Sequence, residues 1–148
     1  MIDFKKQLAA ASAEIKSNVD KAVRSTAIEL LGELVRKTPV GNPGLWKGDA
    51  PAGYVGGRLR GNWQVQVNSA DTSTIDTVDS IGNGTISKGI SAIKGYSSKD
   101  KAIFISNNLP YAERVEEGWS EQAPAGMMKV SVEKFNEIVV KQARRLNK

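Results

Sequence analysis

The sequence has no cysteine and no histidine. Without cysteine the chain cannot form disulfides, thiolate nucleophiles or zinc sites built on sulfur, and this composition is typical of proteins made in a reducing cytoplasm. Histidine is the commonest general base and the commonest metal ligand. Its absence excludes Ser-His-Asp triads, imidazole proton relays and most transition-metal sites. Any catalysis would depend on carboxylate, Lys, Tyr or Ser/Thr side chains.

The chain also lacks long apolar runs. A membrane-spanning helix needs roughly 18 or more consecutive apolar residues, and no such run occurs. Residues 1–16 lack the unbroken apolar core of a secretory signal. We therefore expect neither export by that route nor insertion into a membrane.

What is present fits an ordinary folded protein. The 148 residues are 40% hydrophobic and 25% charged, close to the average of globular domains, which predicts a single domain over residues 1–148. The net charge of +5 permits an acidic partner, nucleic acid included, but it is modest for this length. Charge alone therefore selects no function.

Apolar residues recur every three or four positions from residue 4 to residue 37, which predicts one amphipathic helix. They are Phe4, Leu8, Ala11, Ile15, Val19, Ala22, Val23, Leu30, Leu34 and Val35. Asp3 can cap its start, and Thr38-Pro39 ends it. At 1.5 Å per residue this helix is about 50 Å long, more than a small domain needs. It either bends, near residues 17–18 or Gly32, or extends its first part toward a neighbouring chain.

Residues 39–62 are dense in glycine and proline and predict a long loop. Loops longer than about 15 residues inside compact domains are usually functional or disordered. This loop carries Trp46 and Tyr54, which are costly to leave in water. We interpret the loop as a segment that becomes ordered against a partner.

The second half of the chain predicts strands and helices in alternation. Residues 62–69 have the alternation of a strand with one wet face, and residues 101–108 predict a further strand whose two faces are both rather apolar. Residues 73–100 predict a weak hairpin or a loop with two short strands, with Asn83-Gly84 as its turn. A final helix of about 15 residues has apolar residues at helical spacing: Val132, Phe135, Val139, Ala143 and Leu146. The predicted fold class is α+β, a mostly antiparallel sheet with a long N-terminal helix and a C-terminal helix packed on one face.

Four glutamates lie close together, at positions 113, 116, 117 and 121. Two carboxylates three or four residues apart on a helix could act as a hydrolase pair or hold Mg²⁺ or Ca²⁺. No further set of ligating aspartates accompanies them, and Arg114 lies among them. The pattern favours a short surface helix over residues 110–118, opened by Pro110 and closed by Gly118, with its acids in water.

Two arginines, Arg58 and Arg60, lie among glycines next to Trp63. In an extended chain both would point to the same side, where they could contact phosphates or a carboxylate of a neighbouring subunit. The basic residues of the C-terminal helix complement the negative end of that helix and need no partner.

An apolar cluster, Trp119, Pro124, Met127 and Met128, follows the glutamates in a segment broken by glycine and proline. Aromatic and methionine residues on irregular segments are enriched at protein contacts. A buried interior loop is the competing interpretation, and the residues alone leave both open.

The order of these motifs resembles the tail-completion or neck proteins of long-tailed double-stranded DNA phages. In that family a Thr-Pro-Val motif follows a long helix, and then come Gly-Arg-Leu-Arg, a strand, an Asn…Pro-Tyr-Ala…Glu-x-Gly motif, a Gln-Ala-Pro turn and a terminal helix. The matching residues here are Thr38, Pro39, Val40, Gly57, Arg58, Leu59, Arg60, Asn107, Pro110, Tyr111, Ala112, Glu116, Gly118, Gln122, Ala123, Pro124, Gly126 and Met127. The chain departs from the family by an insertion over residues 41–55.

The resemblance implies a non-enzymatic virion protein, made in the host cytoplasm, that completes the head-proximal end of the tail and helps join it to the head. It implies no catalytic residue, metal or cofactor. Expected partners are copies of itself in a ring of six-fold symmetry, and the tail tube, terminator and head-closure or connector proteins. The alternatives are a tail terminator ring protein and, in a different class, a small basic nucleic-acid-binding protein.

Subunit or partner contacts are assigned to aromatic, charged and methionine side chains in and around these motifs. They are Trp46, Tyr54, Arg58, Arg60, Tyr111, Glu116, Trp119 and Met127. The two arginines could also contact DNA in the channel without reading its sequence. One hypothesis places the arginine loop on one side of the subunit and the segment 113–121 on the other, so that neighbouring copies attract.

Overall fold

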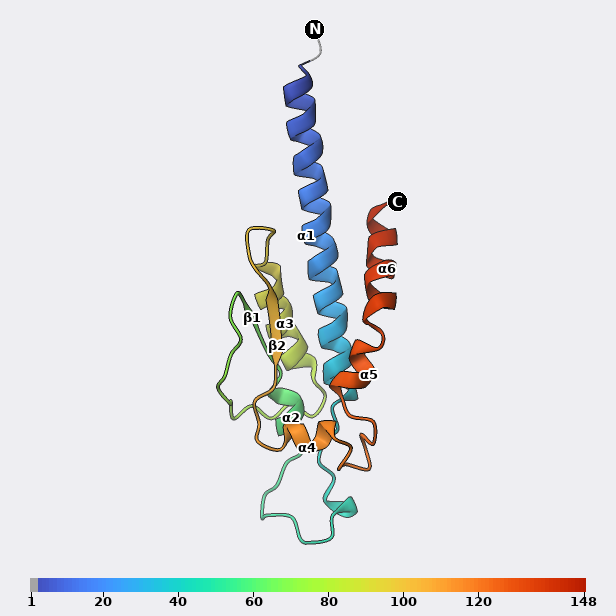
Figure 1. The fold of residues 1–148 in the computed structure, drawn as a ribbon. Helices are drawn as coiled ribbons and strands as arrows, with labels where there is room; N and C mark the ends of the chain where they lie inside the picture. Colours follow the sequence, from blue (N-terminus) through green and yellow to red (C-terminus); the bar gives the residue numbers. More distant parts are fainter. Residues whose placement is uncertain (1–2) are drawn as a thin grey trace.

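A computed structural model describes residues 3–148. Figure 1 shows a long N-terminal helix whose first part projects from the body formed by the other elements. The elements are α1 (Phe4–Lys37), the 3-10 turn η1 (Pro43–Leu45), α2 (Arg58–Gly61), β1 (Gln64–Val67), α3 (Asn83–Lys94), β2 (Ile103–Ser106), α4 (Ala112–Glu116), α5 (Met128–Val132) and α6 (Phe135–Leu146). Strands β1 and β2 form a two-stranded antiparallel sheet, with Gln64 opposite Ser106 and Val67 opposite Ile103. The predicted α+β class and the two predicted strands are confirmed.

Helix α1 has the predicted bounds. The Asp3 carboxylate accepts a hydrogen bond from the Lys6 backbone N–H at 3.3 Å, and the Thr38 hydroxyl donates to the Leu34 carbonyl at 2.6 Å where the helix ends. The helix is continuous through residues 17–18 and Gly32. Its buried residues begin only at Ala27, so the first half projects into solvent.

The core forms around the second half of α1, which packs between α3 and α6, while β1 packs on α3. The buried core consists of Ala27, Leu31, Leu34, Val35, Leu59, Trp63, Ile93, Leu109, Ala112 and Met127. Trp63 is held in place because its indole N–H donates to the Thr38 hydroxyl at 2.7 Å. The end of α1 is therefore fixed to the start of the sheet.

The predicted hairpin over residues 73–100 is wrong, because Asn83–Lys94 form helix α3. The Asp79 carboxylate accepts hydrogen bonds from the Gly82 N–H (2.7 Å), the Thr85 N–H (2.8 Å) and the Thr85 hydroxyl (2.8 Å), which satisfies the free donors of the first turn. Thr85, Gly89 and Ile93 are four residues apart and form the buried face of this helix. Tertiary packing and this cap outweigh the turn-forming Asn-Gly pair.

Two further predictions need correction. Arg58–Gly61 is a helical turn and not extended chain, so Arg58 and Arg60 do not share one side by alternation. The single C-terminal helix is two helices, α5 and α6, joined at residues 133–134. The Ser131 hydroxyl donates to the Met127 carbonyl at 2.8 Å, a bond from side chain to backbone of the kind that often bends helices.

The Asp79 cap gives a first prediction. Burial acts to raise the pKa of the Asp79 carboxyl, but its hydrogen bonds with Thr85 and Gly82 outweigh burial and lower it. A lowered pKa means that the stabilisation is present above the unfolded-state pKa and is lost as pH falls through the folded-state value. We expect Asp79→Asn to reduce the free energy of unfolding in urea by about 1 kcal/mol at pH 7, and by less at pH 3.

Asp76→Asn is the matched control, because the Asp76 side chain is 98% exposed and forms only a surface ion pair with Arg58 at 3.0 Å. Its unfolding should stay close to that of the parent protein. Equal losses for the two variants would contradict the capping role of Asp79.

Candidate functional site

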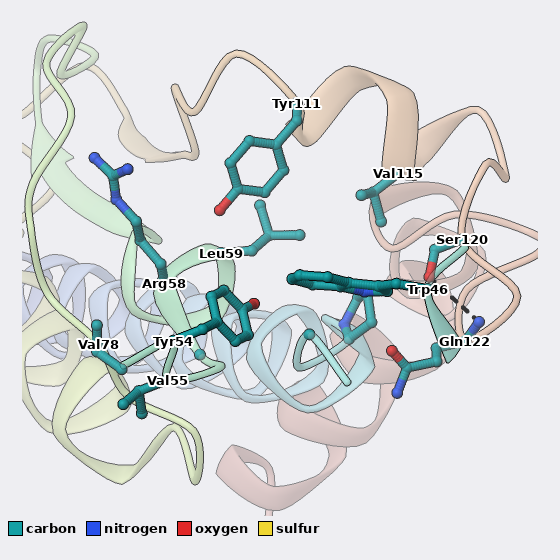
Figure 2. Close-up of a pocket in the computed structure, with 13 residues that line it drawn as sticks. Trp46, Tyr54, Val55, Arg58, Leu59, Val78, Tyr111, Val115, Ser120 and Gln122 are labelled. Atoms are coloured by element: carbon teal, nitrogen blue, oxygen red, sulfur yellow. Dashed lines mark hydrogen bonds between the residues drawn. The ribbon is translucent and has the colours of Figure 1, made fainter. Parts of the chain in front are cut away.

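A cleft of about 520 Å³ lies at the end of the molecule away from the start of α1. The loop after α1 forms one wall, and α2 with the segment around α4 forms the other. Its lining consists of Pro39, Gly41, Trp46, Tyr54, Val55, Gly57, Arg58, Leu59, Val78, Tyr111, Val115, Ser120 and Gln122. Figure 2 shows Tyr111 and Val115 coming from the α4 side while Trp46 and Tyr54 come from the loop. Residues predicted separately from two distant segments thus meet in one place.

Trp46 and Tyr54 pack edge to face, with ring centroids 4.8 Å apart and planes at 65°. The loop can fold back in this way because glycine stands at two close approaches. A Cβ at Gly41 would overlap the Tyr54 hydroxyl, and a Cβ at Gly56 would lie 2.5 Å from the Gly41 carbonyl oxygen. Both rings remain partly exposed, Trp46 at 41% and Tyr54 at 38%. The insertion therefore supplies an aromatic wall to the cleft.

Tyr111 points into the cleft from the α4 side, and Arg58 of α2 lines the same cleft. Burial raises the pKa of the Tyr111 hydroxyl, and the positive charge of Arg58 partly opposes this rise. Arg58 Nη2 donates to Asp76 Oδ1 at 3.0 Å, but the Arg58 side chain is 47% exposed and that of Asp76 98%, so the arginine is available to another partner. The cleft thus combines apolar surface with one accessible cation.

A second hollow of about 340 Å³ continues from the first and shares five lining residues with it, Trp46, Tyr111, Val115, Ser120 and Gln122. Trp119 lines this hollow and is 73% exposed. The Arg114 guanidinium lies 5.6 Å from the centre of the Trp119 ring, within cation–π range. We call the joint surface of Trp46, Tyr54, Tyr111 and Trp119 the aromatic cleft.

Arg60, in contrast, holds the chain together. Its Nε and Nη2 donate to the Thr38 carbonyl at 3.1 and 2.7 Å, and its Nη1 donates to the Ser80 carbonyl at 2.5 Å. The Thr-Pro-Val and Gly-Arg-Leu-Arg motifs are therefore joined through Thr38, which Trp63 also contacts. Because the guanidinium serves two backbone carbonyls, a DNA contact at this site would depend on Arg58.

Glu116 has a similar internal role. Its Oε2 accepts from the backbone N–H groups of Met127 (2.8 Å) and Met128 (2.7 Å), and its Oε1 accepts from that of Lys129 (2.9 Å). These are the free donors at the start of α5, and Met127 itself is 2% exposed. Although burial acts to raise it, the pKa of Glu116 is lowered by these three N–H groups. The carboxylate therefore closes the loop that carries Trp119.

Two glycines make this closed loop possible. Gly118 and Gly126 adopt φ values of +86° and +84°, which L side chains rarely adopt. A Cβ at Gly118 would lie 2.5 Å from the Pro124 carbonyl oxygen, and one at Gly126 would lie 2.6 Å from the Glu116 carbonyl oxygen. The Glu-x-Gly and Gln-Ala-Pro motifs thus have a clear structural reason.

The hypothesis of opposite charged sides needs correction. Arg58 and the segment from Tyr111 to Gln122 line the same cleft, so they do not lie on opposite sides of the subunit. Sequence analysis also missed Val55 and Val78, whose signal was an isolated apolar residue in a polar or glycine-rich segment.

Among residues 3–148 there is no group of three or more carboxylates placed to hold a metal ion. None of the helices in that range combines the length and apolar character needed to cross a bilayer.

Comparison with protein families gives a match over residues 2–118 to the family described as "Bacteriophage HK97-gp10, putative tail-component". Comparison with curated proteins and with solved structures gave no significant match. The matched range contains α1, the aromatic wall, the sheet and α4, and ends just before Trp119. It covers most of the chain, and the chain therefore belongs to the HK97-gp10-like family of phage tail components.

Proposed function

We propose that this protein completes the head-proximal end of a phage tail and helps join the tail to the head, acting as a six-fold ring of identical subunits. The family supports a structural role in the tail. The observation that carries the finer role is the aromatic cleft at one end of the molecule, with an exposed tryptophan at its rim. Such a surface suits a protein contact better than a reaction.

The exposure of these side chains supports a contact. Trp119 is 73% exposed, and Trp46, Tyr54 and Tyr111 are each about 40% exposed. Tryptophan, tyrosine and arginine are the residues that most often dominate binding energy, each contributing about 2 kcal/mol or more when buried at the centre of an interface. A chain that leaves all three types around one cleft has a surface suited to a partner.

A ring gives such a cleft a natural occupant. In a ring each subunit presents two different surfaces, one to each neighbour, and rotation closes the contacts that would otherwise polymerise. A concave aromatic surface on one side requires a convex apolar segment from the next subunit or from an adjoining tail protein. Arg58 at the wall and Arg114 at the rim would favour a partner segment that carries a carboxylate.

The test is Trp119→Ala in the phage. The side chain is mostly exposed, so the free variant should fold as the parent does, but heads and tails should fail to join and infectious particles should fall by at least about 100-fold. Ile81→Ala is the matched control, because Ile81 is 74% exposed and lies outside the aromatic cleft. Wild-type yields from Trp119→Ala, or equal losses in both variants, would contradict the contact role.

Electron microscopy of the same lysates separates the alternatives. Loss of a completion protein should leave tails of normal length beside full heads, whereas loss of a terminator should give tails of uncontrolled length. The nucleic-acid alternative predicts salt-dependent binding of duplex DNA that Arg58→Ala abolishes. If DNA binding survives Arg58→Ala, the aromatic cleft is not the DNA-binding site.

A further inference from the structure

The first half of α1 carries an apolar stripe that no part of residues 3–148 covers. The stripe consists of Phe4, Leu8, Ala11, Ile15 and Val19, and we call it the α1 stripe. Its four large side chains are 50–74% exposed. A helix in water with such a face is marginal on its own, because helices in proteins gain most of their stability by packing an apolar face. The stripe therefore needs an occupant.

The same face of α1 runs on into an open apolar groove of about 310 Å³ between α1, β2 and α6. Its lining consists of Ala22, Val23, Thr26, Ala27, Leu30, Ile103, Ile105, Phe135, Val139 and Ala143, with no charged side chain. Helix α6 is fixed by Ile138, by Gln142 and by the Lys141–Glu29 ion pair at 2.7 Å. This leaves Phe135 and Val139 facing the groove, 41% and 38% exposed. The stripe and the groove form one continuous apolar surface.

The residues that form this surface on α1 have the same spacing when read from either end of the helix. Apolar or groove-lining residues stand at positions 4, 8, 11, 15, 19, 23, 26 and 30, with steps of 4, 3, 4, 4, 4, 3 and 4 residues. Two antiparallel α1 helices centred at residue 17 therefore match residue for residue. Phe4 would face the partner's Leu30, and Ile15 would face the partner's Val19. The stripe of each copy enters the groove of the other.

The charges favour this antiparallel arrangement. Glu14 and Lys21 are exposed, form no ion pair within residues 3–148, and lie on one flank of the stripe because seven residues make two turns. The antiparallel register places Glu14 beside the partner's Lys21, twice by symmetry. A parallel pairing shifted by 15 residues also matches the apolar positions, but it covers the stripe of only one of the two copies. The helix dipoles favour antiparallel pairing as well.

We propose that a second copy of this chain covers the α1 stripe, through a reciprocal antiparallel pairing in which each stripe lies in the partner's groove between β2 and α6. The contact extends about 40 Å along the helices, enough for an interface of standard size. It is a two-fold contact, distinct from the ring contact proposed above. The aromatic cleft lies at the opposite end of each copy and stays free.

The proposal is tested by sedimentation equilibrium of the full chain. The parent protein should be a dimer at about 100 µM, and Ile15→Glu should weaken dimerisation by at least about 100-fold, since it places two carboxylates in an apolar contact. Ala10→Glu is the matched control, because residue 10 lies on the face of α1 opposite the stripe. A monomeric parent, or an Ile15→Glu variant that dimerises like the parent, would overturn the proposal.

Charge exchange tests the orientation. Glu14→Lys alone and Lys21→Glu alone should each weaken dimerisation about ten-fold, because each creates like-charge neighbours. The double variant restores both pairs and should dimerise like the parent. A double variant weaker than both single variants would overturn the antiparallel register. Circular dichroism controls for folding: Ala10→Glu and the double variant should keep the helicity of the parent, since these residues touch nothing in the monomer core.

Discussion

Glu116→Gln is expected to lower the free energy of unfolding by about 2–3 kcal/mol at neutral pH. The carboxylate accepts three backbone N–H groups, and hydrogen bonds to a charged acceptor contribute about 1.5–3 kcal/mol each before allowance for partial exposure. A glutamine keeps one oxygen and turns an NH₂ group toward these donors, so at least one N–H at the start of α5 loses its partner. Urea unfolding of the full chain measures the loss.

The pH dependence identifies the charge as the cause. The pKa of Glu116 is lowered: burial alone would raise it, and the N–H groups of Met128, Lys129 and Met127 outweigh burial. Its contribution is therefore complete above the unfolded-state pKa of about 4.3 and is lost as pH falls through the lower folded-state value. The gap between parent and Glu116→Gln should be large at pH 7 and small at pH 3. A gap that does not change with pH would contradict this explanation.

Glu117→Gln provides the control, because Glu117 is exposed and accepts no side-chain hydrogen bond within residues 3–148. It should unfold like the parent. Glu116→Gln should also reduce head–tail joining even where the protein still folds, because the loop that Glu116 closes presents Trp119. This effect would be one of positioning, and joining should then fall more than in Glu117→Gln.

The long helix and the two strands could be predicted because their signals are local. The apolar spacing of α1 runs over 34 residues, Asp3 supplies an N-cap and Thr38-Pro39 supplies a stop. In β1 Gln64 and Gln66 alternate with Val65 and Val67, and β2 is a short run rich in apolar and β-branched residues, Ile103–Ser106. Such signals depend on neighbouring residues only, so a sequence is sufficient to read them.

Helix α3 could not be predicted with the same rules, because its stability comes from distant residues. The segment contains two glycines, an Asn-Gly pair and several β-branched residues, all poor helix formers. The helix forms because the Asp79 carboxylate caps it and because Gly89 lets it lie close to Leu31 of α1 and Val65 of β1. A stricter search for four-residue spacing, Thr85 to Gly89 to Ile93, would have indicated a helix.

The sequence predicts which aromatic residues form the aromatic cleft, but it does not predict that they lie together. Trp46, Tyr54, Tyr111 and Trp119 stand out as aromatic residues on irregular segments, but only the folded chain shows that they share one surface. Arg60 and Glu116 look like surface charges in the sequence and instead bind backbone groups far away along the chain. Side chain to backbone bonds of this kind leave no spacing pattern that a sequence reader can use.

Gly89→Val should destabilise the protein by about 3 kcal/mol and lower the melting temperature by about 10 °C. A Cβ at this position would lie 2.2 Å from Leu31 Cδ2 and 3.0 Å from Val65 Cγ2. Leu31 is 0% exposed and surrounded by core, so it cannot turn away from the new atoms. The valine must therefore push α3 away from α1 and from the sheet.

Gly84→Val places the same change in the same helix at an open position, where the nearest atom to a new Cβ is Asp79 Oδ2 at 3.4 Å. It should shift the melting temperature by no more than about 3 °C, because valine and glycine differ little in helix propensity. If calorimetry gave equal losses of melting temperature for the two variants, backbone flexibility would explain the glycine at position 89 better than close packing. A large loss at Gly89 alone would mean that the absence of a side chain at this residue allows α1, α3 and the sheet to pack into one core. This packing in turn positions the residues of the aromatic cleft.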